Sequence, residues 1–252
     1  MQEQQTAPQE PAKPMSFTDK VAGVFASPGE VYEQVRLAPP TASNWVIPTL
    51  ILIVLSIAAI LLVTKDPVLM DQMMAPQREA LAKAVQDGRI TQDVADRQAE
   101  MMGAGSPFFL IGLLVGTPIS LFAMLFLFSL VFWLLGKLAM KSTAPFMKVV
   151  EVYGLTFYIG VLGVLVTAAL RFALGAFHAS PSLALFALPF DVHNKLHMAL
   201  SMVNIFTIWG LVVTSIGLAK LFQRDFPKVL VLIFAIWILL SIVLILIGIP
   251  MA

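Results

Sequence analysis

The feature that most constrains this chain is a set of five long stretches without a charged side chain, separated by short charged connectors. A helix of about 20 apolar residues crosses the hydrocarbon core of a bilayer, which is roughly 30 Å thick. Because each stretch is close to this length or longer, the sequence predicts an all-α polytopic membrane protein. We place its transmembrane helices at residues 45–63, 108–136, 152–170, 198–219 and 229–249.

Composition supports this fold class and excludes several function classes. Hydrophobic residues make up 59% of the chain and charged residues only 12%, whereas soluble domains carry about 25% charged residues. The net charge of +1 gives no basic face for nucleic acid. The chain has no cysteine, which excludes disulfides, thiolate metal sites and cysteine nucleophiles. No catalytic, nucleotide or cofactor motif is present, so we predict a protein that is not an enzyme and needs no cofactor.

The residues before the first span divide into a tail and two short helices. Residues 1–15 are rich in Gln and Pro and predict a disordered tail, and we treat 16–252 as one membrane domain. Ser16 and Asp19 have the spacing of a capping box, and Ser27, followed by proline, marks a second helix start. The apolar faces of these helices either rest in the headgroup region, as interfacial helices do, or cover the end of the helix bundle.

Two further segments interrupt the pattern of spans. Residues 64–106 form the one long polar loop, whose helix formers and Gly88 predict a helical hairpin outside the membrane. Residues 172–190 are uncharged but broken by a histidine and two prolines, so we predict an interfacial or re-entrant segment. A sixth span is the alternative for this segment.

The second span carries a proline and a glycine motif. It is longer than the bilayer requires, and Pro118 is the expected bend because it removes a backbone donor within the helix. Gly112 and Gly116 form a GxxxG motif, and the third span also carries glycines. Small residues let helices approach closely in membranes, so we expect these two spans to pack through their glycines.

The distribution of Lys and Arg predicts the orientation, because cytoplasmic connectors carry an excess of these residues. Only Lys65, Arg171 and Lys195 lie near the membrane on the second side. We therefore predict a cytoplasmic N-terminus and a C-terminus outside. The first side carries nine, namely Lys13, Lys20, Arg36, Lys137, Lys141, Lys148, Lys220, Arg224 and Lys228.

Polar residues in or beside the spans are the candidates for function, because lipid makes their burial costly. Glu151 and Tyr153 stand at the cytoplasmic start of the third span, with Lys148 one turn earlier. They are either a functional site or an interfacial ion pair, and we favour the ion pair. Arg171, at the other end of this span, either pairs with an aspartate (Asp191 or Asp66) or extends its charged group to the interface alone, which we favour.

A histidine cluster raises the hypothesis of a metal site. His193 and His197 share a helical face at i and i+4, Asp191 lies just before them, and His178 is a further possible ligand. The chain lacks the HExxH glutamate that would strengthen this hypothesis. We favour histidines at the start of a helix near the interface and predict no metal.

Two segments resemble the Yip-domain (Ypt-interacting-protein-like) family of integral membrane proteins. Val24 to Ile57 is similar to its entry, which has a Ser-Pro-x-Glu helix, a Pro-containing connector and a span that starts with Trp. Phe146 to Val166 is similar to its amphipathic approach to a Tyr-containing third span. The resemblance implies five helical spans and a cytoplasmic N-terminus. Eukaryotic relatives are associated with Rab-type GTPases, whereas the short N-terminal region and long first loop resemble bacterial members. We therefore expect a bacterial inner membrane.

Two function classes fit these observations. The first is a non-enzymatic scaffold or adaptor that sits in the lipid bilayer and binds protein partners or a second copy of itself, and we favour it. The second is a small oligomeric transporter or channel with a site near residues 172–190 and Arg171, since broken helices often form transport sites.

Overall fold

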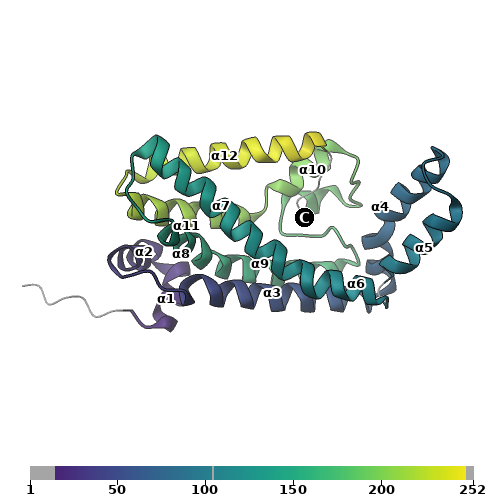
Figure 1. Ribbon diagram of the computed structural model, residues 1–252, viewed down its shortest axis with the longest axis horizontal. Helices are drawn as coiled ribbons and strands as arrows, with labels where there is room; N and C mark the ends of the chain where they lie inside the picture. The colour runs from purple at the N-terminus through teal and green to yellow at the C-terminus, as the bar shows by residue number, and fades with distance from the viewer. Residues whose placement is uncertain (1–14, 104, 248–252) are drawn as a thin grey trace, which may run out of the picture.

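Long helices that lie side by side form the body of the molecule. The computed structural model describes residues 15–103 and 105–247, and these residues form helices and no strand. Figure 1 shows α1 and α2 at one end of the helix bundle and α4 and α5 at the other. The prediction of an all-α polytopic membrane protein is confirmed. Five stretches are long and apolar enough to span a membrane: Ser43–Val63 (α3), Pro107–Met140 (α6, η1 and α7), Phe146–Leu174 (α8 and α9), Ile205–Phe222 (α11) and Phe226–Ile247 (α12).

The second span bends where the sequence predicted a bend. Its helical residues divide into α6 (Pro107–Ile111), a π-helical turn η1 (Gly112–Gly116) and α7 (Thr117–Met140). Pro118 has no N–H, and its ring would clash with the carbonyl one turn earlier in a regular helix. The wider π turn directly before Pro118 relieves this conflict. The 34 residues of this span correspond to about 51 Å at 1.5 Å per residue, so the span extends beyond the hydrocarbon core.

The third span starts earlier than predicted. It consists of α8 (Phe146–Leu155) and α9 (Phe157–Leu174), with a break at Thr156, whose hydroxyl donates to the carbonyl oxygen of Tyr153 at 2.6 Å. The predicted boundary at residue 152 is wrong because the polar pair before it is buried within the bundle.

The fourth span starts later than predicted, and the fifth starts slightly earlier. Residues 198–202 belong to a separate helix, α10 (Lys195–Met202), whereas α11 begins at Ile205. Asn204 separates the two helices, and its side chain accepts a hydrogen bond from the N–H of Phe206 at 2.9 Å. An Asn that caps α11 in this way stops the span from extending backwards into α10. The fifth span, α12, starts at Phe226, and the predicted residues 248–249 lie outside the described part.

The segment 172–190 contains no sixth span. It holds the end of α9, a loop and the short 3-10 helix η2 (Leu183–Ala187). The segment then folds back beside the start of α11, because the N–H of Leu183 donates to the carbonyl oxygen of Val203 at 3.1 Å and that of Ile205 to the carbonyl of Pro181 at 3.0 Å. The following helix, α10, packs beside α12 (Figure 1). That this segment dips into the bilayer stays a prediction.

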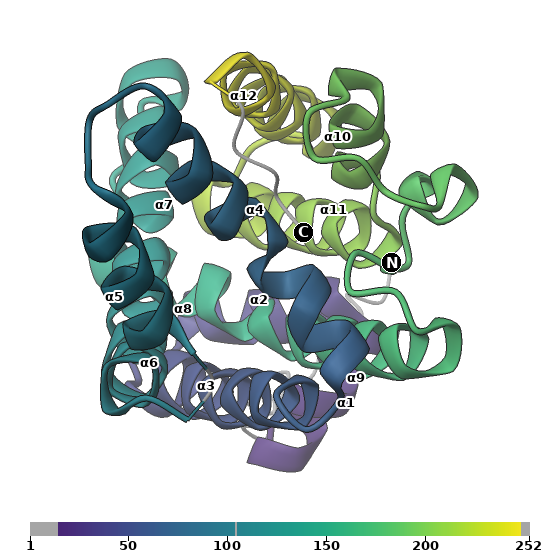
Figure 2. The same cartoon turned by 90° about the vertical axis from the view of Figure 1, so that its right-hand side faces the viewer.

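The predicted hairpin is present in the first long loop. It consists of α4 (Pro67–Gln86) and α5 (Gln92–Met102), and Figure 2 shows both helices at the near end of the bundle. The carboxylate of Asp66 caps α4 by accepting the N–H groups of Val68 and Leu69. Gly88 adopts φ +70° in the turn, a left-handed conformation that suits glycine.

The two N-terminal helices cover the end of the bundle. α1 (Phe17–Ala26) starts with the predicted capping box, and α2 (Pro28–Leu37) follows it directly. Val24, Val31 and Val35 are fully buried or nearly so, so the apolar faces rest on the other helices. The interpretation as an end cover is confirmed for these faces. Their position relative to the headgroups stays a prediction, and the predicted tail lies almost wholly in residues 1–14, outside the described part.

The glycines pack differently from the prediction. A Cβ at Gly112 or Gly116 would meet no atom within 4 Å, whereas one at Gly154 would collide with Trp45 of α3. Gly163 lies against Phe206 of α11. The expected packing of the second and third spans through their glycines is therefore wrong. α7 contacts α8 through aromatic rings, and Gly154 and Gly163 of the third span pack against α3 and α11.

Candidate functional site

Polar side chains gather in the bundle at two places, which lie at opposite ends of the third span. We call the first the Glu151 cluster, made of Lys20, Asn44, Lys148 and Glu151. We call the second the Arg171 cavity, a space between α3, α7, α9 and α11. The two differ in whether their charges find partners.

The carboxylate of Glu151 lies on α8 and is 1% exposed. Its Oε1 accepts the backbone N–H of Thr41 at 2.7 Å, and its Oε2 accepts the side-chain amide of Asn44 at 2.8 Å. The ammonium of Lys148 lies 3.3 Å from Oε1. A buried carboxylate is stable only with partners of this kind, and Glu151 has three.

The lysines connect this carboxylate to the N-terminal helices. The ammonium of Lys148, which is 4% exposed, donates to the carbonyl oxygen of Val35 in α2 at 2.6 Å. Lys20 of α1 donates to the Oδ1 of Asn44 at 3.4 Å. The Glu151 cluster therefore joins α1, α2, α3 and α8, which are distant in the sequence. The ion pair that the sequence favoured is present, but both of its groups are buried inside the bundle and have lost the access to water that an interfacial pair would keep.

Tyr153 stands next to the cluster but belongs to an aromatic group. Its ring centroid lies 5.3 Å from those of Phe132 and Phe157, in edge-on geometry. Edge-on pairs of this kind stabilise packing. Tyr153 also lines the Arg171 cavity at its inner end, so it connects the two places rather than completing the Glu151 cluster.

Cationic side chains also surround an open cavity at the α1 and α2 end. This cavity of about 490 Å³ is lined by Arg36, Lys141 and Arg224 among others. The guanidinium of Arg224 donates to the carbonyl oxygen of Met140 at 2.7 and 3.0 Å. Arg36 pairs with Glu33, and the hydrogen bond from this guanidinium lowers the pKa of the Glu33 carboxyl. The surface here carries more positive than negative charge.

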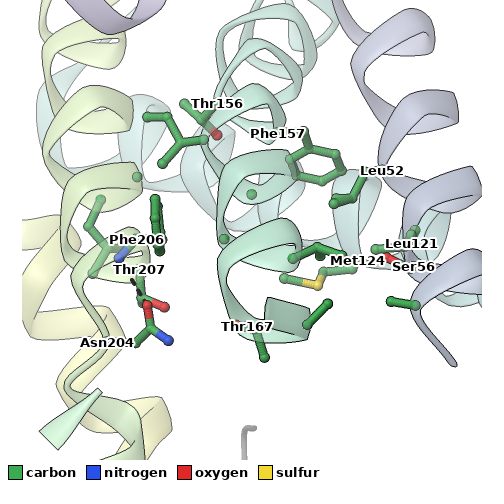
Figure 3. A pocket seen from close by; sticks show the side chains of 18 of the residues that line it. Leu52, Ser56, Leu121, Met124, Thr156, Phe157, Thr167, Asn204, Phe206 and Thr207 are labelled. Atoms are coloured by element: carbon green, nitrogen blue, oxygen red, sulfur yellow. Dashed lines mark hydrogen bonds between the residues drawn. The ribbon is translucent and has the colours of Figure 1, made fainter. Parts of the chain in front are cut away.

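The Arg171 cavity has a volume of about 450 Å³. Figure 3 shows Leu52, Met124 and Phe157 on its wall, with Asn204 and Thr207 on the helix opposite. Its lining contains no Asp or Glu. Hydroxyl and amide groups stand at intervals among apolar side chains, namely Ser56, Thr156, Thr167, Asn204, Thr207 and Thr214.

Arg171 lies on the last turn of α9 and lines this cavity. Its guanidinium carbon stands 4.5 Å from the ring centroid of Phe177, and its Nε is buried without a hydrogen-bond partner. Neither predicted partner is in place, because Asp66 caps α4 and Asp191 accepts the N–H of His193. Within the described residues, Arg171 forms no ion pair.

The loop after α9 is tied to the hairpin. The side-chain amide of Gln72 in α4 donates to the carbonyl oxygen of Gly175 at 2.9 Å and accepts the N–H of Phe177 at 2.8 Å. His178 stacks on Phe190 at 4.8 Å. Burial, and secondly the charge of Arg171, lower the pKa of His178 below its ordinary value of 6.5.

The residues of the metal hypothesis do not converge. His193 bonds to Glu79 at 3.1 Å, whereas His197 accepts the N–H of Asp191 through Nδ1 at 3.0 Å. His178 is engaged elsewhere. In residues 15–103 and 105–247, no group of three or more His, Asp or Glu side chains has the spacing of a metal site. His197 thus ties α10 to the loop before it, and His193 of that loop contacts α4.

Sequence reasoning missed several residues of both places. Asn44 and Thr41 bond to Glu151 from more than 100 positions away, and the only local signal was an Asn at the start of an apolar span. Thr167, Asn204 and Thr207 had no signal, because isolated hydroxyls and amides are common in apolar helices and only the packing of α9 against α11 brings them together.

The helical bundle and its buried polar groups define an integral membrane protein with five apolar spans and no recognisable catalytic site among the described residues. The model of the Yip1 domain matches residues 22–248. The chain therefore belongs to the Yip1 domain family, as the resemblance of its entry and third span indicated. No curated protein and no solved structure matches the chain.

Proposed function

We propose that this protein is a membrane scaffold or adaptor that presents α1, α2 and the adjoining connectors as a rigid platform for partner proteins. The observation that carries the proposal is the Glu151 cluster, which connects α2 to the bundle through a buried hydrogen bond from Lys148 and α1 through a part-buried one from Lys20. A rigid surface binds partners with a smaller loss of conformational entropy than a mobile one. No enzymatic activity is needed for this role.

The charge of the platform supports this proposal. Lys137 in the last turn of α7, Lys141 just after it and Lys228 in the first turn of α12 are exposed. Figure 1 shows these ends of α7 and α12 on the side of the molecule where α1 and α2 lie. An excess of Lys and Arg is typical of cytoplasmic connectors. We therefore propose that the platform faces the cytoplasm of a bacterium and that the protein resides in the inner membrane. Acidic surfaces of partner proteins, or a second copy with complementary loops, are the chemistry that this surface favours.

Site-specific crosslinking tests the scaffold role. A photo-reactive amino acid replaces Leu37, an exposed apolar residue at the end of α2, and a matched control carries it at Ile242 on α12, which is also exposed. The proposal predicts discrete protein adducts from Leu37 and lipid adducts from Ile242. Protein adducts from Leu37 should be lost in Glu151→Ala, which releases the platform. Lipid adducts alone at both positions would contradict a protein-binding platform.

The Arg171 cavity favours a second candidate, a small oligomeric transporter or channel. The cavity lies between spans and combines one cation with several hydroxyl groups, and polar groups at membrane depth often mark transport paths. Flux of small anions into proteoliposomes, with its loss in Arg171→Ala, would support transport. Absence of flux from vesicles that hold correctly folded protein would exclude it.

A further inference from the structure

We propose that the Arg171 cavity binds one anionic phospholipid, with the lipid phosphate at the Arg171 guanidinium and an acyl chain along the cavity wall. The inference is independent of both proposed activities, because a lipid bound in this way requires neither a protein partner nor transport. It follows from the polarity of the cavity, its missing countercharge and its opening.

The cavity is polar at the end where Arg171 stands. Gly163 of α9 lies against Phe206 of α11, because a Cβ added at Gly163 would stand 3.3 Å from the Cβ of Phe206. Thr167 and Arg171 follow Gly163 by one and two helical turns on the same face, so they extend past the start of α11, where Asn204 caps the helix. The side chains of Asn204 and Thr207 at the start of α11 line the cavity at this same end.

The remainder of the cavity is mainly apolar. Its wall is formed largely by Leu52, Leu121, Met124, Phe157, Val164 and Leu211, among which Ser56, Thr156 and Thr214 carry isolated hydroxyl groups. This predominantly apolar wall suits a hydrocarbon chain. Its volume of about 450 Å³ lies within the 300–1,000 Å³ that is typical of ligand sites.

The cation lacks a countercharge. Arg171 has no acidic partner among the described residues, and the cavity lining contains no carboxylate. Phe177 covers one face of the guanidinium, which lies half-buried and does not extend freely into water. A buried charge is costly unless it is paired, and a phosphate accepts two parallel hydrogen bonds from a guanidinium. A phospholipid brings that phosphate and the apolar chain in one molecule.

The cavity is open to lipid from the side. Met124, which lines it, is 42% exposed on the surface of a membrane span. A lipid can therefore enter from the surrounding bilayer without passing through the aqueous phase. The other large cavities of the bundle either lie in the polar connectors or lack a cation, as does the one lined by Gly112 and Gly116.

Two substitutions separate the two halves of the site. Arg171→Gln removes the charge at the polar end. Gly210→Leu fills the apolar part, since a Cβ at Gly210 has no atom within 4 Å and this residue lines the cavity. The matched control is Gly112→Leu, an equally open glycine on another cavity, and Arg171→Lys retains the charge. All variants are required to elute as the wild type does on size exclusion.

The experiment measures lipid binding by native mass spectrometry of the full-length protein in neutral detergent with added phosphatidylglycerol or phosphatidylcholine of the same acyl chains. We expect one phosphatidylglycerol to bind in preference to phosphatidylcholine. Hydrogen bonds to charged groups are worth enough for Arg171→Gln to weaken this binding by about tenfold to a hundredfold, with partial rescue in Arg171→Lys. Gly210→Leu should lose it, and Gly112→Leu should keep it.

Four results would overturn the proposal. Equal binding of the two lipids by the wild type would remove the role of Arg171, and so would undiminished binding in Arg171→Gln. Binding that survives in Gly210→Leu would place the acyl chain elsewhere. Thermal stabilisation by inorganic phosphate alone, equal to that by phosphatidylglycerol and lost in Arg171→Gln, would assign the site to a soluble anion instead of a lipid.

Discussion

The two ends of the third span hold charged side chains in opposite states. At its start, Glu151 is 1% exposed and is bonded to a lysine, an amide and a backbone N–H. At its end, Arg171 lines a cavity and has an Nε without any partner. Glu151 lies on α8 and Arg171 on α9 of the same span, and the difference comes from the groups that pack around each residue.

The comparison separates a structural site from a binding site. A buried polar group with all its partners supplied by the chain rigidifies the fold, and the Glu151 cluster does this for α1 and α2. A buried polar group without partners is costly in free energy unless something outside the chain supplies them. A charged residue in an apolar span can thus stabilise the fold or bind a ligand, and only its contacts in the folded protein distinguish the two roles.

The largest expected effect is on the free energy of unfolding when the Glu151 cluster is broken. Glu151→Ala leaves the Lys148 ammonium buried without its carboxylate, and loss of one partner of a buried pair costs about 3–5 kcal/mol. Titration of sodium dodecyl sulfate into protein in neutral detergent micelles measures this free energy. The double variant Lys148→Met with Glu151→Leu should recover most of the loss. If Glu151→Ala alone were as stable as the wild type, the Glu151 cluster would not stabilise the fold, and the contrast with Arg171 would be contradicted.

A somewhat smaller effect is expected at Gly154, which lets α3 approach α8 beside the cluster. A Cβ there would collide with Trp45, and overpacking of this kind costs about 1–3 kcal/mol. The thermal unfolding midpoint of Gly154→Ala should therefore fall. Gly112→Ala is the matched control because its Cβ meets open space, and its midpoint should not fall. Equal midpoints for the two variants would mean that α3 and α8 are not in close contact.

At the other end, Arg171→Gln should raise the pKa of His178 toward 6.5, since the charge of Arg171 is the second cause that lowers it. Burial remains as the first cause, so the pKa should stay below that value. The chain has only three histidines, which makes their titration separable by NMR of labelled imidazoles. An unchanged His178 pKa would show that Arg171 points elsewhere.

His178 also predicts a pH dependence of stability. Its folded pKa is lower than the unfolded value of 6.5, so the unfolded chain binds the proton first. The stability contribution is complete above pH 6.5 and declines as the pH falls from there through the folded pKa. On acidification below pH 6.5 the thermal midpoint of the wild type should therefore fall relative to that of His178→Gln, so that the two midpoints converge or cross. A difference that stays constant with pH would contradict a lowered pKa of His178.

The smallest effect is expected for the partly exposed pair of Glu33 and Arg36 at the surface of the platform. Surface ion pairs contribute about 0–1 kcal/mol and weaken with salt. Glu33→Gln should change the free energy of unfolding by less than this amount, and the change should shrink in high salt. If Glu33→Gln lowered the free energy of unfolding as much as Glu151→Ala does, burial of the carboxylate would not explain the importance of Glu151. The contrast that the account draws would then be contradicted.

The sequence predicted the spans well because apolar length is a local property. Uncharged stretches identified all five helices, and Pro118 identified the bend of the second. The boundaries were less accurate where tertiary contacts decide them. The sequence predicts that the third span starts after Glu151, since charges normally mark the interface, whereas the helix already begins at Phe146 and buries both Lys148 and Glu151.

The candidate sites were less predictable than the fold. The sequence named Glu151 and Arg171, because a charge in an apolar stretch is visible without a structure. It did not reveal that Asn44 and Thr41 would satisfy the first while Asp66 and Asp191 would be engaged away from the second. Partners more than 100 residues apart are set by helix packing and loop conformation, which the local pattern does not encode.

The most direct test of the account is the side of the membrane on which each end of the bundle lies. The chain has no cysteine, so a single cysteine in place of the exposed Thr18 in α1 or the exposed Gln92 in α5 is the only labelling site. A maleimide that does not cross membranes is applied to intact bacterial spheroplasts expressing each variant. The account predicts that the Gln92→Cys variant is labelled and that the Thr18→Cys variant is labelled only after lysis. Labelling of both variants from the outside would contradict the account in two ways. The number of spans between the two residues would not be odd, and the platform would not face the cytoplasm.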